Sequence, residues 1–138
     1  MNGAWQRHIN NSTDDGVVVG IPHIFLRLEG LAVLACATSY YWHSGFSWIV
    51  FAALFFAPDI FMVGYLLNSR LGALIYNIGH SYVTPCLIIA ASLFSDIEFG
   101  IAMGIIWIAH IGFDRAVGYG LKYTDAFQHT HLGPFVRK

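Results

Sequence analysis

The chain has 138 residues, of which 57% are hydrophobic and only 11% are charged, and its formal net charge is −1. Soluble domains usually carry roughly 25% charged residues, so this composition is that of a small integral membrane protein. The low charge fraction argues against disorder, and the small net charge argues against a nucleic-acid partner held through its phosphates.

The N-terminal segment, residues 1–20, is polar over its first sixteen positions, which we expect to be flexible. It does not resemble a signal peptide. The apolar run that follows is too long for the hydrophobic region of such a peptide, and no small-residue cleavage pattern comes after it. We therefore expect the first helix to remain in the mature protein.

Four apolar runs follow, each close to the about 20 residues that a helix needs to cross the hydrocarbon core. They cover residues 22–42, 46–67, 71–94 and 98–121, with links of only three residues between them. Such short links allow only antiparallel neighbours. The predicted fold is all-α, an integral membrane four-helix up-down bundle over residues 21–122. Pro58 predicts a kink in the second helix because it has no N–H to donate.

The basic residues predict the orientation of this bundle. The side shared by the termini and the middle link carries every Lys and Arg of the chain: Arg7, Arg27, Arg70, Arg115, Lys122, Arg137 and Lys138. The other two links carry none, so the positive-inside rule places both termini in the cytoplasm. Residues 123–138 then emerge on the cytoplasmic side, where they could cap the mouth of a cavity between the helices.

Polar side chains interrupt the apolar helices at one depth. Ionisable groups within a spanning helix are costly and by default mark a functional site. At 1.5 Å per residue, the polar positions lie about 9–16 Å from the cytoplasmic ends of their helices, so the four helices bring them to one layer. These positions are Glu29, Asp59, Asn77, His80, His110 and Asp114.

Helical spacing predicts that these side chains face inward together. Asn77 and His80 are three residues apart, and His110 and Asp114 are four apart, so each pair shares a helix face. The candidate catalytic and metal-ligating residues are Glu29, Asp59, His80, His110 and Asp114.

Further residues could support this layer. Tyr76 is four residues before His80 and, with Asn77, could orient the ligands, while Tyr119 and Arg115 could contribute to binding. His131, in the C-terminal segment, could act from a lid as a further ligand or base.

Two chemistries use this set of residues. Inward carboxylates and histidines from facing helices could hold a divalent metal ion, zinc or iron, although the Glu-x-x-His motif of di-iron bundles is missing. Alternatively, a carboxylic acid kept protonated by burial could work without metal, as in an isomerase or cyclase of an isoprenoid-like substrate. We favour the metal, because two histidines beside three carboxylates would capture a divalent ion readily.

Two other classes remain as alternatives. The polar residues could simply join the helices through hydrogen bonds, although this many are expensive for that purpose. A proton- or ion-coupled transporter is less favoured, because a conduction path needs polar lining through both leaflets and the outer halves of the helices are almost wholly apolar. We therefore expect a small membrane enzyme with a lipophilic substrate, in contact with membrane lipid. The substrate and the oligomeric state, including a homo-oligomer, stay open.

Several motifs together resemble those of a family of short bacterial membrane proteins, domain of unknown function 4260. The resemblance covers about residues 22–133, in order, and implies a multi-pass protein of the bacterial inner membrane in which the polar layer belongs to the family pattern. It implies no activity. The motifs are Arg27-Leu28-Glu29-Gly30, Ala57-Pro58-Asp59, Tyr76-Asn77-x-x-His80-Ser81-Tyr82, Ala109-His110-Ile111-Gly112-Phe113-Asp114-Arg115, Gly118-Tyr119-Gly120-Leu121-Lys122-Tyr123 and Thr130-His131-Leu132-Gly133.

Overall fold

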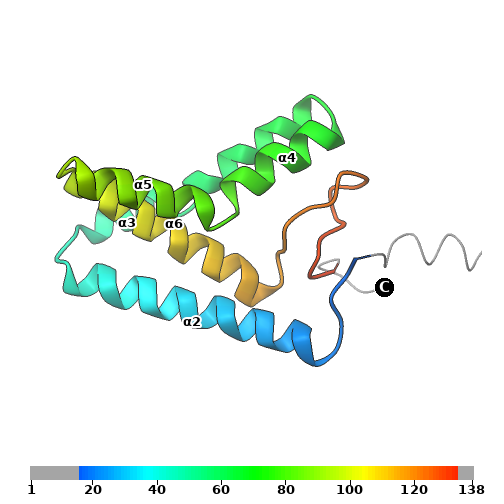
Figure 1. Ribbon diagram of the computed structural model, residues 1–138, viewed down its shortest axis with the longest axis horizontal. Helices are drawn as coiled ribbons and strands as arrows, with labels where there is room; N and C mark the ends of the chain where they lie inside the picture. The colour runs from blue at the N-terminus through cyan, green and yellow to red at the C-terminus, as the bar shows by residue number, and fades with distance from the viewer. Residues whose placement is uncertain (1–15, 134–138) are drawn as a thin grey trace, which may run out of the picture.

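The structure is a computed structural model that describes residues 16–133. Within this range the chain is all-α, as predicted, with five α-helices and one 3-10 helix (Figure 1). The elements are α2 (Ile21–His43), α3 (Trp48–Leu54), the 3-10 helix η1 (Ala57–Leu66), α4 (Ser69–Gly79), α5 (Val83–Phe94) and α6 (Glu98–Val117). The expectation for residues 1–15 lies outside the described residues.

Three segments are long and apolar enough to cross a membrane, and a fourth is added when the bent pair α4 and α5 is taken as one span. These segments follow the four predicted runs and indicate a multi-pass membrane protein. The first run corresponds to α2, whose first turn contains Pro22. The last run ends at Val117 rather than at residue 121. Gly118 adopts a left-handed φ of 103°, which ends α6.

The second span differs from the single helix that we predicted. It passes from α3 into η1, although residues 48–66 still form one apolar span. Pro58 has no N–H to bind the carbonyl group of Leu54, as a continuous α-helix would require. The Asp59 N–H donates instead to the carbonyl group of Phe56, over a distance of 3.1 Å, which is the shorter 3-10 pattern. The predicted kink is therefore a change of helix type.

The third predicted helix is also divided. It breaks after Gly79 into α4 and α5, which are bent by 43° relative to each other. Pro85 lies in the first turn of α5 and has no N–H for the carbonyl group of Ser81, so a continuous helix would lose this bond. The break places His80 between two helices rather than inside one.

The carbonyl groups freed by this break are paired with side chains. Unpaired backbone groups are costly in a membrane interior. The carbonyl groups of Ile78, Gly79 and His80 accept hydrogen bonds from Thr84 Oγ1, Trp107 Nε1 (2.6 Å) and Arg115 Nη2 (2.9 Å), respectively. Two of these donors belong to α6, so this helix holds the broken span in place.

Helix α6 lies at the centre, between α2 and α5, whereas α4 packs on η1 and this pair projects away from α2 (Figure 1). Glycines bring α2 and α6 together. A Cβ atom added to Gly112 would lie 2.8 Å from the backbone nitrogen of Leu34 and 2.9 Å from the carbonyl oxygen of Gly30. At this spacing, any side chain at position 112 would push the two helices apart.

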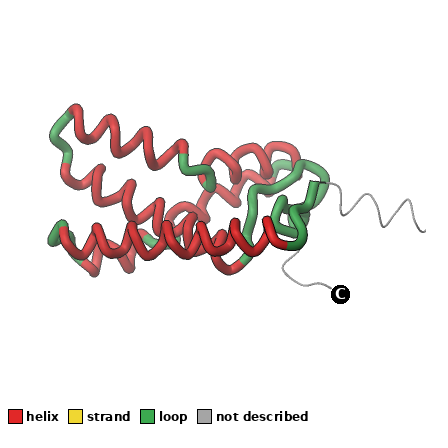
Figure 2. The backbone as a smooth tube through the Cα atoms, turned by 60° about the horizontal axis from the view of Figure 1, so that its bottom comes forward, coloured by secondary structure: helices red, strands yellow, loops and turns green. Residues whose placement is uncertain are grey.

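The C-terminal segment, residues 118–133, folds over the end of the helices where α2 begins (Figure 2). The side chain of Asn77 forms two hydrogen bonds with the backbone of Lys122, at 2.8 and 2.9 Å. The N–H of Val18 donates to the carbonyl group of His131, and His23 Nε2 donates to that of Leu132. These contacts tie the segment to α4 and to the start of α2.

The Gly112→Ala variant should be less stable by about 1–3 kcal/mol, because the new methyl group meets backbone rather than movable side chains. Thermal unfolding of the purified protein in detergent measures this effect. Ala35→Leu on the exposed face of α2 is the control and should unfold near the wild-type temperature. Equal stability of Gly112→Ala and the wild type would contradict the close α2–α6 contact.

Candidate metal centre

Four of the predicted site residues meet in one cluster. Asp59 comes from η1, His80 from the break between α4 and α5, and His110 and Asp114 from one face of α6. Each offers one ligand atom, and these four atoms lie within 4.8 Å of one another. The side chains of both histidines are almost completely buried, and that of Asp59 is 32% exposed. Three separate elements thus contribute to one buried centre that could hold a metal ion.

The two imidazole nitrogens lie close to each other and to one oxygen of each carboxylate. The two Nε2 atoms of His80 and His110 are 3.4 Å apart. Asp59 Oδ1 lies 3.4 and 3.5 Å from these nitrogens, and Asp114 Oδ2 lies 3.6 Å from each. Atoms that bind one zinc ion tetrahedrally at about 2.1 Å are about 3.4 Å apart, so these five distances fit ligands around one ion. The two carboxylate oxygens lie within 4.8 Å of each other.

The backbone fixes which nitrogen of His80 faces this centre. His80 Nδ1 lies 3.1 Å from the carbonyl oxygen of Tyr76, and because a carbonyl group only accepts, Nδ1 must carry the proton. A neutral His80 therefore turns the lone pair of Nε2 toward the cluster. The ring of Tyr76 stacks on that of His80, with centroids 3.8 Å apart and planes at 10°. Metal-binding histidines typically donate their other ring N–H to a carbonyl group or carboxylate, as Nδ1 of His80 does.

The cluster gathers more acceptors than donors. Nε2 of a neutral His80 and the carboxylate oxygens of Asp59 and Asp114 all present lone pairs at 3.4–3.6 Å. Such a group is stable only if a proton or a cation lies among the lone pairs. Nδ1 of His110 is buried and has no hydrogen-bond partner within residues 16–133. Either a proton on His110 Nε2 or a metal cation at the centre would satisfy these lone pairs.

Glu29 does not belong to this cluster, and the expectation that it faces inward is wrong. Its side chain is exposed on α2. The next residue, Gly30, is the one that meets α6, since a Cβ atom there would lie 2.4 Å from that of Arg115. Successive helical residues point about 100° apart, so the contact at Gly30 turns Glu29 away.

Asn77 and His131 serve the C-terminal segment instead of the cluster. Asn77 binds the backbone of Lys122, as described above. His131 Nδ1 accepts a hydrogen bond of 2.8 Å from the N–H of Leu121, and burial lowers the pKa of this imidazole, which favours the neutral form. Neither side chain reaches the four ligand atoms, so the expected roles as an orienting group and a ligand do not fit this geometry.

Arg115 and Tyr119, predicted to contribute to binding, lie near the cluster and are not among its four residues. The guanidinium group of Arg115 is buried and donates to the carbonyl groups of His80 (2.9 Å) and Tyr119 (2.8 Å). It therefore holds the backbone that carries His80 and the first loop residues after α6. The side chain of Tyr119 is 40% exposed and lines a cavity beside the cluster.

This cavity has a volume of about 280 Å³ and gives access to three of the four ligands. Its walls come from η1, α4, α6 and the C-terminal segment, so that segment contributes to the cover of the cavity. The residues that line it are Phe56, Asp59, Met62, Tyr76, His110, Phe113, Asp114, Tyr119, Lys122 and Phe127. A metal ion among the ligands would thus face a mostly aromatic pocket.

Lys122 also lines this cavity, although no role in the site was predicted for it. Its Nζ donates to the carbonyl group of Phe127 at 2.7 Å and lies 3.5 Å from the ring centroid of Phe127 and 4.8 Å from that of Tyr76. Burial lowers its pKa to about 8. Its place in the run Gly118–Tyr123, beside Tyr119, was the available signal.

Comparison with known proteins gives a family and no activity. No curated protein and no solved structure is significantly similar to the chain. Residues 23–135 match a family model, which covers all four residues of the cluster and most of the chain. The chain therefore belongs to the family described as domain of unknown function (DUF4260).

Proposed function

We propose that the protein is a small membrane metalloenzyme that binds one divalent ion, zinc or iron, through Asp59, His80, His110 and Asp114. The observation that carries this proposal is the set of 3.4–3.6 Å distances between the ligand atoms. Hydrogen bonds between a protonated imidazole and a carboxylate are shorter, about 2.7–2.9 Å. The observed spacing suits atoms arranged around an ion better than atoms that share a proton.

The donor set fits a borderline or hard transition metal. Imidazole suits zinc and iron, and carboxylate oxygens complete the coordination of either. Two features favour a catalytic centre over a purely structural one: Asp59 is partly exposed, and the cavity reaches Asp59, His110 and Asp114. A divalent ion held there would supply Lewis-acid polarisation of a carbonyl or phosphoryl oxygen.

The cavity supports a lipophilic substrate with a polar head. Phe56, Met62, Phe113 and Phe127 give it apolar walls, and Lys122 contributes an ammonium group that is mostly protonated at pH 7. Two carboxylates would balance the charge of a divalent ion, which leaves Lys122 as the excess positive charge facing the cavity. An anionic or oxygen-rich head group is the natural partner for this charge.

The orientation of the protein in the membrane follows from the basic residues at the end of the molecule that holds the C-terminal segment. The start of α2, the start of α4 and the C-terminal segment lie at that end, which carries Arg27, Arg70 and Lys122. We place it in the cytoplasm by the positive-inside rule, in the bacterial inner membrane. The metal-free isomerase or cyclase remains the alternative function, because the same carboxylates and imidazoles could transfer protons.

Metal content tests the centre directly. The purified full chain should retain about one zinc or iron ion per molecule by elemental analysis, as expected for a site with four protein ligands. His110→Ala should lose the ion. Glu29→Ala, which removes an exposed carboxylate outside the cluster, is the matched control and should keep it.

Asp59→Asn provides a second test if His110→Ala does not fold, since Asp59 is the most exposed of the four ligands. It should weaken metal retention without loss of the folded state, as judged by thermal unfolding in detergent. A folded wild-type protein that takes up neither zinc nor ferrous iron would refute the metal centre and favour metal-free proton transfer.

The contact between Tyr76 and His80 gives a separate prediction. Tyr76→Leu removes the ring stacked on His80 but keeps the backbone carbonyl group that fixes its tautomer. Metal affinity should fall about 10-fold, the lower end of the range for changes to residues that hold a metal ligand in place. Competition with a chelator of known affinity measures this value.

Asn77→Ala is the control for Tyr76→Leu. Asn77 is next to Tyr76 on α4, and its removal frees only the backbone of Lys122. Metal affinity should therefore stay within about twofold of the wild type. An equal loss in both variants would mean that the ring of Tyr76 has no specific role in holding His80.

A further inference from the structure

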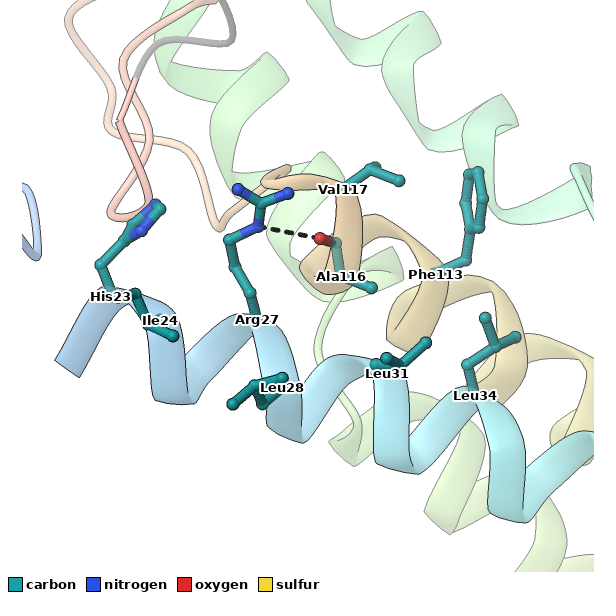
Figure 3. Close-up of a pocket in the computed structure, with 9 residues that line it drawn as sticks. All are labelled: His23, Ile24, Arg27, Leu28, Leu31, Leu34, Phe113, Ala116 and Val117. Carbon is teal, nitrogen blue, oxygen red and sulfur yellow. Dashed lines mark hydrogen bonds between the residues drawn. The ribbon is translucent and has the colours of Figure 1, made fainter. Parts of the chain in front are cut away.

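A groove separate from the metal cavity runs between α2 and α6, with a volume of about 680 Å³ (Figure 3). On α2, residues 23, 27, 31 and 34 follow one helix face, and on α6 the groove is bounded by residues 113, 116 and 117. Apart from His23 and Arg27, every lining side chain is apolar: Ile24, Leu28, Leu31, Leu34, Phe113, Ala116 and Val117.

The groove is polar at one end and apolar at the other. His23 and Arg27 lie at the end beside the C-terminal segment, and Leu34 and Phe113 lie at the opposite end (Figure 3). The distance from Arg27 to Leu34 along α2 is about 10 Å. A phospholipid has the same order of chemistry along its length, with a charged head followed by an acyl chain.

Arg27 retains donors for a ligand. Its Nε donates to the carbonyl group of Ala116 over 2.9 Å, which pairs a carbonyl group in the last turn of α6 and orients the guanidinium group (Figure 3). This bond uses one of the five N–H groups of the side chain. The two terminal nitrogens have no hydrogen-bond partner within the described part of the chain, and Arg27 is exposed.

Charge selects the kind of lipid. Among the described residues that line the groove there is one permanent cation and no acid. Basic pockets between helices on the cytoplasmic side of a membrane bind anionic head groups, and the planar guanidinium group matches a phosphate with two parallel hydrogen bonds. A zwitterionic head group would bring a second cation to a site that has no partner for it.

We propose that this groove binds an anionic phospholipid, with its phosphate on the terminal nitrogens of Arg27 and one acyl chain along Leu31, Leu34 and Phe113. None of the four residues of the metal cluster lines the groove, and Phe113 lines both the groove and the metal cavity. Arg27 thus has two roles: it pairs the end of α6 and it recognises a lipid.

Lipid retention tests this site. The full chain is reconstituted in vesicles with equal amounts of phosphatidylglycerol and phosphatidylcholine of the same acyl chains, extracted in mild detergent, and analysed by native mass spectrometry. The wild type should retain one phosphatidylglycerol per chain, about fivefold over phosphatidylcholine, the ratio that corresponds to one basic residue near a membrane surface. Arg27→Gln should abolish this preference.

Two variants separate the groove from general surface charge. Arg70→Gln removes an exposed cation from the same end of the molecule but outside the groove, and it should keep the preference. Ala116→Leu fills the groove while keeping Arg27, and it should lose the bound lipid. It therefore tests the groove in the event that Arg27→Gln does not fold. Unchanged retention in Ala116→Leu, or an equal loss in Arg27→Gln and Arg70→Gln, would overturn the proposal.

Discussion

The cost of an unpaired carbonyl group in a membrane interior governs this structure. Breaking the third span frees the carbonyl groups of the residues around His80, and a lipid environment offers them no donors. Trp107 and Arg115 of α6 supply two of the missing hydrogen bonds. Because these bonds fix the backbone on both sides of the break, they also fix His80, which would lie on the face of a continuous helix if the span were unbroken.

Helix α6 connects this break to the rest of the cluster. His110 and Asp114 lie one helical turn apart on α6, the helix whose Trp107 and Arg115 also pair the freed carbonyl groups. This one helix therefore carries two residues of the cluster and holds the backbone of a third, His80. Asp59 enters from η1, where Pro58 changes the helix type. The 3-10 helix η1 and the break between α4 and α5 therefore each contribute one residue to the cluster, and the regular helices α2 and α6 provide the frame around it.

Hydropathy and helical periodicity predicted the parts of the structure that depend on local sequence. The four apolar runs and the common depth of Asp59, His80, His110 and Asp114 followed from counting residues along each helix. The break at His80 was not predicted, although Pro85 was a local signal for it. The pairing of its carbonyl group could not be predicted from local sequence, because Arg115 lies 35 residues further along the chain. The outward position of Glu29 likewise depends on where Gly30 meets α6, which is a property of helix packing.

The two proposed sites meet at Phe113. Among the described residues that line them, this side chain is the one shared by the groove and the metal cavity. It lies between Gly112, where α2 and α6 touch, and the ligand Asp114. An acyl chain in the groove would therefore lie one aromatic ring away from the cavity. For the lipophilic substrate proposed above, entry from the bilayer would lead past Phe113, and entry from the cytoplasm would lead past the C-terminal segment and Lys122.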